Sequence, residues 1–336
     1  MPTACILQKG ANLKLRSERI EVWAPQEEGG ASSRIRDIPI HDIDRLILRE
    51  GAQISSESLC ALLRADIPIS LLGWNDRFAG SFLPPTNHHG LWRLKQYGKT
   101  LDAGFALHIA RRLVLAKIAN QRRVIQRLAA NRDADAPEEI IHFLQSMRRL
   151  SELTADLEEL RGYEGAAAAR YFQSWAAFLP EEFPFERRST RPPHNPVNAC
   201  ISFGATLLYN EMVAAIHSHG LDPALGLLHA TENGRWSLAL DLMEPFRPVL
   251  VEALALDLFT HQMVDTTCFE PHQGGIYLSE KGRRIFVLQY ERRVERQFMS
   301  EHAGHRTTLR EQLSATATQF KSALDHPECF LPFEMN

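Results

Sequence analysis

Hydrophobic residues in the first 85 positions occur in short runs that polar residues interrupt. The runs are separated by Gly, Pro, Asn and Asp, and they lie at residues 4–7, 20–23, 38–40, 45–48 and 67–72. Short apolar runs bounded by turn-forming residues predict β-strands. Residues 55–65 differ, because serines at a capping position precede helical spacing, which predicts a helix. This part of the chain therefore predicts a small β-rich domain.

The spacing becomes helical beyond residues 82–90, a connector rich in chain-breaking residues. We expect one or two long helices over 91–131 and further helices over 137–160, 165–179, 196–218, 249–264 and 290–325. Asn195 and Pro196 predict the start of one of them, and the proline-rich, charged residues 180–195 predict a long loop. A small hairpin is expected over 274–289, turning around 280–282.

These patterns predict a multi-domain α+β protein. A small β-rich domain, which we expect to mediate dimerisation, spans residues 1–87. A larger all-helical domain spans residues 88–336 and carries the candidate chemistry. The length of 336 residues is sufficient for two domains, and the contents of 44% hydrophobic and 24% charged residues are ordinary for a soluble globular protein.

Composition narrows the expected environment. We see no uninterrupted apolar run near 18 residues, and the N-terminus lacks the pattern of a signal peptide, so we expect a cytoplasmic protein without a membrane partner. The five cysteines are scattered and never form a CxxC pair. We therefore expect reduced cysteines that serve packing, rather than disulfides or a zinc ribbon.

Charge is segregated along the chain although the net charge is only −3. Basic residues gather over 93–132, 187–191 and 281–296, whereas acids gather over 138–159. Such segregation suits contacts with nucleic-acid phosphates, although a solvated helix face explains any single run more often than such contacts do. The arginines that we expect to contact DNA from these segments are Arg111, Arg112, Arg122, Arg123, Arg187 and Arg188.

The most informative stretch combines His229 with Asp241 and Glu244. The two acids are three residues apart, so on a helical turn they share one face, and their repulsion calls for a cation or a proton. With a neutral imidazole they would form a mixed set of ligands suited to Mg²⁺ or Mn²⁺. Pro245 and Pro248 place the acids at the entry of a helix. The alternative is a capping acid, a surface acid and a core histidine.

Glu164 is a candidate third acid from elsewhere in the chain. Gly162 and Gly165 flank it and four alanines follow, so another segment or a substrate could approach closely. The alternative is an acid in the first turn of an alanine-rich helix. Glu211 could also approach the site. We expect the other paired histidines to be surface or capping residues, namely His88 with His89, His217 with His219, and His302 with His305.

Four motifs in order resemble the Cas1 family of CRISPR spacer acquisition. They are GYEGAAAARYF from Gly162, RPPHNPVNACISFG from Arg191, GLDPALGLLH from Gly220 and SLALDLMEPFRP from Ser237. The resemblance implies that Glu164, His229 and Glu244 bind the metal and that Asp241 supports them. It implies that Arg247 lies close to the DNA backbone. It also implies homodimers that work with the small companion protein Cas2 to insert double-stranded DNA fragments into the repeat array.

The residue types suit phosphodiester transesterification, in which a 3′-hydroxyl of the incoming fragment attacks a repeat phosphate. A bound metal lowers the pKa of the attacking hydroxyl and offsets the charge that develops on the phosphoryl group. Water in place of the hydroxyl makes the same site an endonuclease. Two alternatives stay open: a stand-alone metal-dependent nuclease that acts on branched DNA, and a non-catalytic scaffold that binds DNA.

Overall fold

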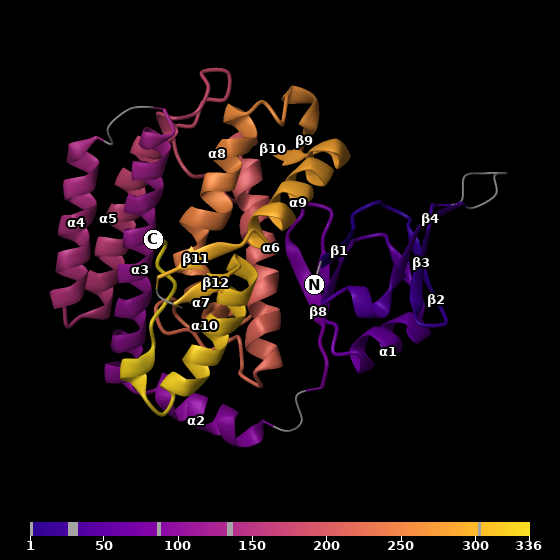
Figure 1. The fold of residues 1–336 in the computed structure, drawn as a ribbon, viewed down its shortest axis with the longest axis horizontal. Helices are drawn as coiled ribbons and strands as arrows, with labels where there is room; N and C mark the ends of the chain where they lie inside the picture. Colours follow the sequence, from indigo (N-terminus) through magenta and orange to yellow (C-terminus); the bar gives the residue numbers. More distant parts are fainter. Residues whose placement is uncertain (1–2, 26–32, 86–88, 133–136, 302–303) are drawn as a thin grey trace.

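The computed structural model describes residues 3–25, 33–85, 89–132, 137–301 and 304–336 (Figure 1). Its N-terminal part holds two four-stranded sheets. In the first, the parallel strands β1 (Thr3–Ile6), β5 (Arg45–Arg49) and β7 (Ile69–Leu72) are followed by the antiparallel β8 (Phe78–Phe82). The second has the order β4 (Arg34–Pro39), β3 (Arg19–Trp23), β2 (Asn12–Arg16) and β6 (Gln53–Ile54). The predicted β-rich region is confirmed, and β2, β6 and β8 are strands that the pattern missed.

The predicted helix in this region is also confirmed, as α1 (Ser56–Arg64). The hydroxyl of Ser55 accepts the backbone N–H of Ser58 and so caps the first turn. Strand β5 shows how the sheet joins the rest of the molecule. Leu46 and Leu48 belong to the core of the β-rich part, whereas Ile47 belongs to the helical core. Successive side chains of a strand point to opposite faces, so one face of this sheet packs against each core.

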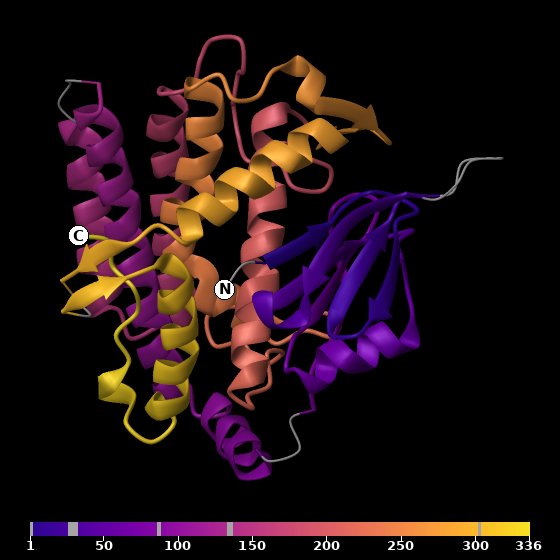
Figure 2. The ribbon, with the colours of Figure 1, turned by 45° about the vertical axis from the view of Figure 1, so that its right-hand side comes forward.

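The helices beyond residue 89 surround one large apolar core. They are α2 (Gly90–Thr100), α3 (Ala103–Ala130), α4 (Glu138–Leu153), α5 (Leu157–Ala176), α6 (Pro196–Ser218), α7 (Ser237–Met243), α8 (Ala253–Thr260), α9 (Glu280–Val294) and α10 (Leu309–Ala323). Helices α3, α4 and α5 stand side by side as a bundle, and α6 runs between this part and the sheets (Figures 1 and 2). The expected start of α6 is confirmed, since the Asn195 side chain accepts the N–H of Asn198.

By length and composition α6 could cross a membrane, with a mean hydropathy of 1.4 over its most apolar window. Of that window, however, 67% is buried inside the protein. Buried residues lie all around the helix, including Cys200, Leu208 and Ile216. A helix that packs on every side is apolar all round, so the hydropathy of α6 is explained by its place in the core.

The helix expected over 137–160 ends early, because Asp156 caps a new one. The Asp156 side chain accepts the N–H of Glu159, and α5 starts at Leu157. Glu164 therefore lies well inside α5, not in a first turn. The loop expected over 180–195 is confirmed, without helix or strand.

The prediction that the region beyond residue 89 is all-helical is wrong. It contains two small hairpins, β9 (Phe269–His272) with β10 (Gly275–Leu278) and β11 (Phe298–Ser300) with β12 (His305–Thr307). The first turns at Gln273 and Gly274, both at positive φ. The turn expected at 280–282 is instead the start of α9, since Ser279 caps that helix. The helix expected over 290–325 is interrupted by the second hairpin.

Candidate active site

The segment from Ser237 to Thr260 is helical throughout, but its geometry changes at the two prolines. Helix α7 passes at Glu244 into a 3-10 turn, Glu244–Phe246, and then into a π-helical stretch, Arg247–Glu252, before α8 begins. Pro245 and Pro248 lack the N–H that a regular helix needs, which explains the irregular turns. The prediction that Asp241 and Glu244 lie at the entry of a helix is therefore wrong. Asp241 lies within α7, and Glu244 lies where the helix changes type.

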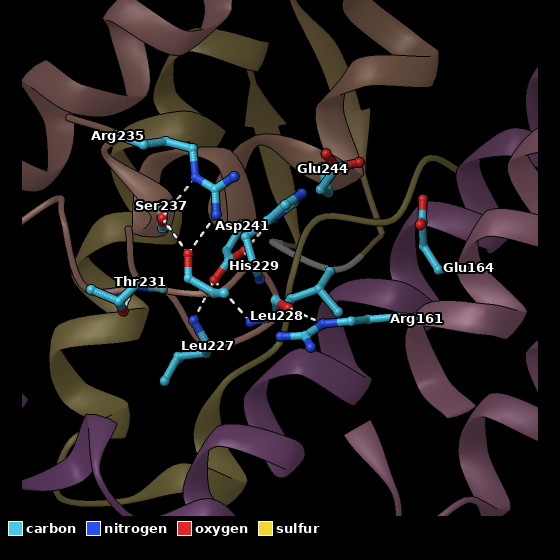
Figure 3. A network of polar contacts seen from close by, with 12 residues as sticks. Arg161, Glu164, Leu227, Leu228, His229, Thr231, Arg235, Ser237, Asp241 and Glu244 are labelled. Atoms are coloured by element: carbon cyan, nitrogen blue, oxygen red, sulfur yellow. Dashed lines mark hydrogen bonds and ion pairs between the residues drawn. The ribbon is translucent and has the colours of Figure 1, made fainter. Parts of the chain in front are cut away.

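Asp241 is fully buried and holds the loop that carries His229. One carboxylate oxygen accepts the backbone N–H groups of Leu227 and Leu228, at 2.6 and 3.0 Å. The other accepts the backbone N–H of His229 at 2.9 Å and faces its Nδ1 at 2.6 Å (Figure 3). An ionised carboxylate only accepts, so Nδ1 carries the proton and the lone pair of the neutral ring lies on Nε2.

Contacts around the loop further restrict its position. Arg161, on α5, donates from Nε to the carbonyl of Leu228 at 2.6 Å, and the Ser237 hydroxyl donates to the carbonyl of Ala230 (Figure 3). A Cβ at Gly226 would collide with the carbonyl oxygen of His229, so only glycine fits this turn. The loop that carries His229 is thus held by several contacts, while the side chain of His229 remains 35% exposed.

Lys117 joins the two candidate ligand acids that come from different helices. Its ammonium forms ion pairs with both Glu164 on α5 and Glu244. Glu244 lies 3.6 Å from the guanidinium of Arg247 as well. The side chains of Lys117 and Glu244 are 9% and 6% exposed, whereas that of Glu164 is 23% exposed. The site is therefore deep at Glu244 and open towards Glu164 and His229.

The pKa shifts follow from burial and from these charges. Burial disfavours the ammonium of Lys117, but Glu244 and Glu164 outweigh this effect and raise its pKa. Burial likewise disfavours the ionised form of Glu244, yet Lys117 and Arg247 hold its pKa well below the usual range. For His229, burial is outweighed by the hydrogen bond and charge of Asp241, so the pKa is raised. Glu244 is therefore ionised at neutral pH.

Arg247 also interacts with a second buried acid, Glu252. Burial raises the pKa of Glu252, and the charge of this guanidinium only partly offsets the effect.

Asn120 on α3, which is fully buried, also contacts the turn that carries Glu244. Its amide donates to the carbonyls of Pro245 and Phe333 at 2.7 and 3.0 Å. The turn that carries Glu244 is therefore tied to α3.

Lys117 and Asn120 are the residues that sequence reasoning missed as parts of the site. Lys117 was grouped with the basic residues of 93–132. The helical period nevertheless carries a signal, because Lys117 lies three and four residues after the buried Val114 and Leu113. A lysine on the apolar face of a helix needs a buried partner, and the structure supplies two.

The arginines expected to contact DNA occupy varied positions. Arg187 is exposed, whereas Arg188 binds the side chains of Asn198 and Ser202. Arg111 and Arg112 line an open groove of about 670 Å³. Arg123 donates to the carbonyl of Asn336. Arg122 is half-buried on α3, and Arg247 pairs with Glu244 as described. Their contact with DNA stays a prediction.

Another basic groove, of about 780 Å³, lies between α3, α8 and α9. Its arginines are Arg127, Arg292, Arg293 and Arg296. Two of the predicted basic segments, 93–132 and 281–296, therefore meet on one surface.

Glu211 does not reach the site. It pairs with Arg45 of β5 and Arg310 of α10, at 3.1 and 3.4 Å. His217 and His219 bond the carbonyls of Pro84 and Ala215, which agrees with a structural role. The other two pairs are not described in full, because His88 and His302 lie outside the described residues.

The donor set suits a divalent cation, although the ligands are not assembled as they stand. Among the described residues no three His, Cys, Asp or Glu side chains lie close enough together to hold a metal. The Lys117 ammonium lies between two of the candidates. The chemistry still fits, since two carboxylates and an imidazole with a directed Nε2 lone pair are ligands that Mg²⁺ and Mn²⁺ accept.

Comparison with known proteins places the chain. The family model described as CRISPR associated protein Cas1 matches residues 4–292. A CRISPR-associated endonuclease Cas1 from Thermodesulfovibrio yellowstonii is 32% identical over 304 residues, covering 88% of this chain and 92% of that protein. A Cas4/Cas1 fusion from Geobacter sulfurreducens is also 32% identical over 304 residues; the match covers 88% of this chain but only 52% of the fusion.

Solved structures share the fold. A Cas1 protein from Thermotoga maritima, 25% identical, matches with a TM-score of 0.80 over 100% of both chains. A chain of a Cas6-RT-Cas1–Cas2 complex, 24% identical, matches with a TM-score of 0.83 over 100% of this chain and 36% of that one, which shows the fold alone. Fold and site define a β-rich and helical protein with an acid–histidine centre. The chain belongs to the Cas1 family of CRISPR-associated proteins.

Proposed function

We propose that this protein is a metal-dependent DNA integrase and endonuclease of CRISPR adaptation. The observation that carries the proposal is the site itself, where Asp241 fixes the tautomer and the position of His229 and where Lys117 pairs with both Glu164 and Glu244. Membership of a family whose curated relatives are named endonucleases supports this function. Mg²⁺ or Mn²⁺ is the proposed cofactor.

Glu164, Glu244 and Nε2 of His229 would hold the metal. When bound, the metal activates the attacking 3′-hydroxyl or water and offsets negative charge on the phosphoryl group. Asp241 keeps the Nδ1 proton in place and so leaves Nε2 free. Asn120 and Arg247 hold the turn of Glu244, through its neighbour Pro245 and its carboxylate respectively. No protein nucleophile takes part, because the attacking group belongs to the DNA or to water.

The proposed partners are a second copy of the chain, Cas2 and double-stranded DNA. A chain of this fold occurs in a complex with Cas2, which supports that partner. The two arginine-lined grooves would hold duplex through its phosphates, without reading much sequence. Arg187 and Arg247 would extend this contact.

The test uses the full chain with Cas2, Mn²⁺, a short duplex with free 3′-hydroxyls and a plasmid that carries repeats. We expect integration products, and we expect His229→Ala to lower their rate by about 100-fold or more, since loss of residues that only support metal ligands already costs 10–100-fold. DNA binding should survive. His41→Ala is the matched control, because His41 is an exposed histidine of the β-rich part.

Three outcomes would contradict the proposal. Undiminished activity in excess chelator would exclude the metal. Cleavage of branched DNA that needs no Cas2, without integration, would favour a stand-alone nuclease. DNA binding with neither integration nor cleavage would leave a non-catalytic scaffold.

A further inference from the structure

Lys117 is a buried lysine whose two partners are both candidate metal ligands. It lies near the middle of α3, with Val114 and Ile118 buried beside it. A buried ammonium is stable only when anions compensate its loss of water. Here the carboxylates of Glu164 and Glu244 do so.

The two acids in turn depend on the lysine. Two carboxylates that contact one ammonium are close enough to repel each other, and the shared cation offsets this repulsion. Glu244 has a second cation in Arg247, at 3.6 Å. Lys117 is the cation that both acids share, through Oε1 of Glu164 and Oε2 of Glu244.

A divalent metal would bind the same carboxylate oxygens that the Lys117 ammonium already contacts. Metal ions of this class bind carboxylate oxygens through their lone pairs, and an ammonium donates its hydrogen bonds to the same lone pairs. Two cations at contact distance from the same oxygens also repel each other. The lysine thus cannot act as a ligand, and its charge opposes the arrival of the metal.

We propose that Lys117 is the built-in counter-cation of the Glu164–Glu244 pair and that its ammonium competes with a divalent metal for these carboxylates. It is a positioning residue that acts through the two acids. The competition rests on the proposed metal-dependent function, whereas the counter-cation role stands on the ion pairs alone. The arrangement keeps the two acids paired and in place before the metal binds, at a cost in metal affinity.

The test compares the full-length wild type with Lys117→Met, which keeps a long unbranched side chain and removes the charge. In chelator we expect the melting temperature to fall by about 5 °C, because the buried Glu244 and the half-buried Glu164 lose their shared cation. The dissociation constant of Mn²⁺, measured by electron paramagnetic resonance or calorimetry, should fall about tenfold. Mn²⁺ should therefore raise the melting temperature of the variant by about 2 °C more than that of the wild type.

Three further variants keep the test decisive even if Lys117→Met folds poorly. Lys117→Arg restores a cation and should return both the stability in chelator and the Mn²⁺ affinity towards wild type. The double change Lys117→Met with Glu164→Gln removes one charge of each sign and should recover stability in chelator. Lys95→Met is the matched control, since Lys95 pairs with Asp325 at the surface and should change neither quantity.

Equal loss of melting temperature with and without Mn²⁺ would reduce Lys117 to a packing residue and overturn the competition. Unchanged or weaker Mn²⁺ binding by a folded Lys117→Met would overturn it too. An unchanged melting temperature in chelator would overturn the counter-cation role. If the wild type itself binds no Mn²⁺, the proposed function and the competition both fail, and the chelator series alone still decides the counter-cation role.

Discussion

Glu211 and Glu244 are both glutamates buried among cations, yet their surroundings differ in access and in the type of partner. Glu211, 3% exposed, is held by Arg45 and Arg310, and Arg310 also binds Glu291 and Glu295. This cluster links a strand of the β-rich part to α6, α9 and α10, and its charged members are arginines and glutamates. Around Glu244 the partners are a lysine and an arginine, and a partly exposed histidine lies nearby.

The two clusters differ in whether their buried charges are suited to chemistry. Arginine is always charged and binds carboxylates in a fixed geometry, so the cluster of Glu211 suits a permanent joint between elements. The cluster of Glu244 has an imidazole with a directed lone pair and an acid, Glu164, that solvent reaches. Burial and charge alone do not distinguish a site from a joint, but donor type and access do.

The largest effect on stability is expected from removing Arg310 from the cluster around Glu211. Arg310→Met leaves the Glu211 carboxylate with one cation fewer in a buried place, so the free energy of unfolding should fall by about 3–5 kcal/mol. Chemical denaturation measures this loss. The activity per folded molecule should remain unchanged, because Arg310 contacts none of the site residues described above.

Lys281→Met is the matched control for this change. Lys281 pairs with Asp265 at 3.0 Å, and both side chains are more than half exposed. A loss of stability as large as that of Arg310→Met would show that burial does not set the strength of these pairs. So would a negligible loss for Arg310→Met itself.

A smaller effect, on activity rather than stability, is expected from Asp241→Asn. In either orientation the amide NH₂ faces groups that donate to Asp241, so the loop of His229 should shift and the activity should fall about 10–100-fold. The pKa of His229 should fall as well, since Asp241 raises it. Nuclear magnetic resonance titration of the imidazole measures the second effect, and an unchanged pKa would contradict the assigned pair.

The same pair sets the pH dependence. Because the pKa of His229 is raised in the folded protein, its protonation favours folding. That contribution is full below the ordinary value of 6.5 and is lost as the pH rises through the folded-state pKa. Metal binding needs the neutral ring, so activity should decline as the pH falls through the same value. In Asp241→Asn this acid limb should move to lower pH.

The smallest effect is expected from Arg161→Met. This change removes the hydrogen bond to the carbonyl of Leu228, next to His229, together with an ion pair to the exposed Glu158. We expect stability to fall by about 1 kcal/mol and activity to fall several-fold, because the histidine loop loses one of several contacts. Arg170→Met is the control, since Arg170 lies on the same helix and pairs with exposed side chains. An equal drop in activity for both variants would exclude a specific role of Arg161.

Much of the fold could be predicted because its signals are local. Ser55 and Asn195 cap the helices expected after them, and the apolar period locates the long helices α3 and α6. The failures also have local causes. Asp156 and Ser279 are capping residues whose effect the apolar pattern hides, and Pro245 changes the type of a helix without ending it.

The residue types of the site and the order of the four motifs can be read from the chain alone, since they are properties of the chain. The apolar face of α3 can be read from it too. Which charges meet depends on the packing of segments that are distant in the chain. Lys117 and Glu164 are 47 residues apart along the chain, and Glu244 joins them through a third segment. Contacts over such separations depend on how helices pack, and no local pattern records that packing.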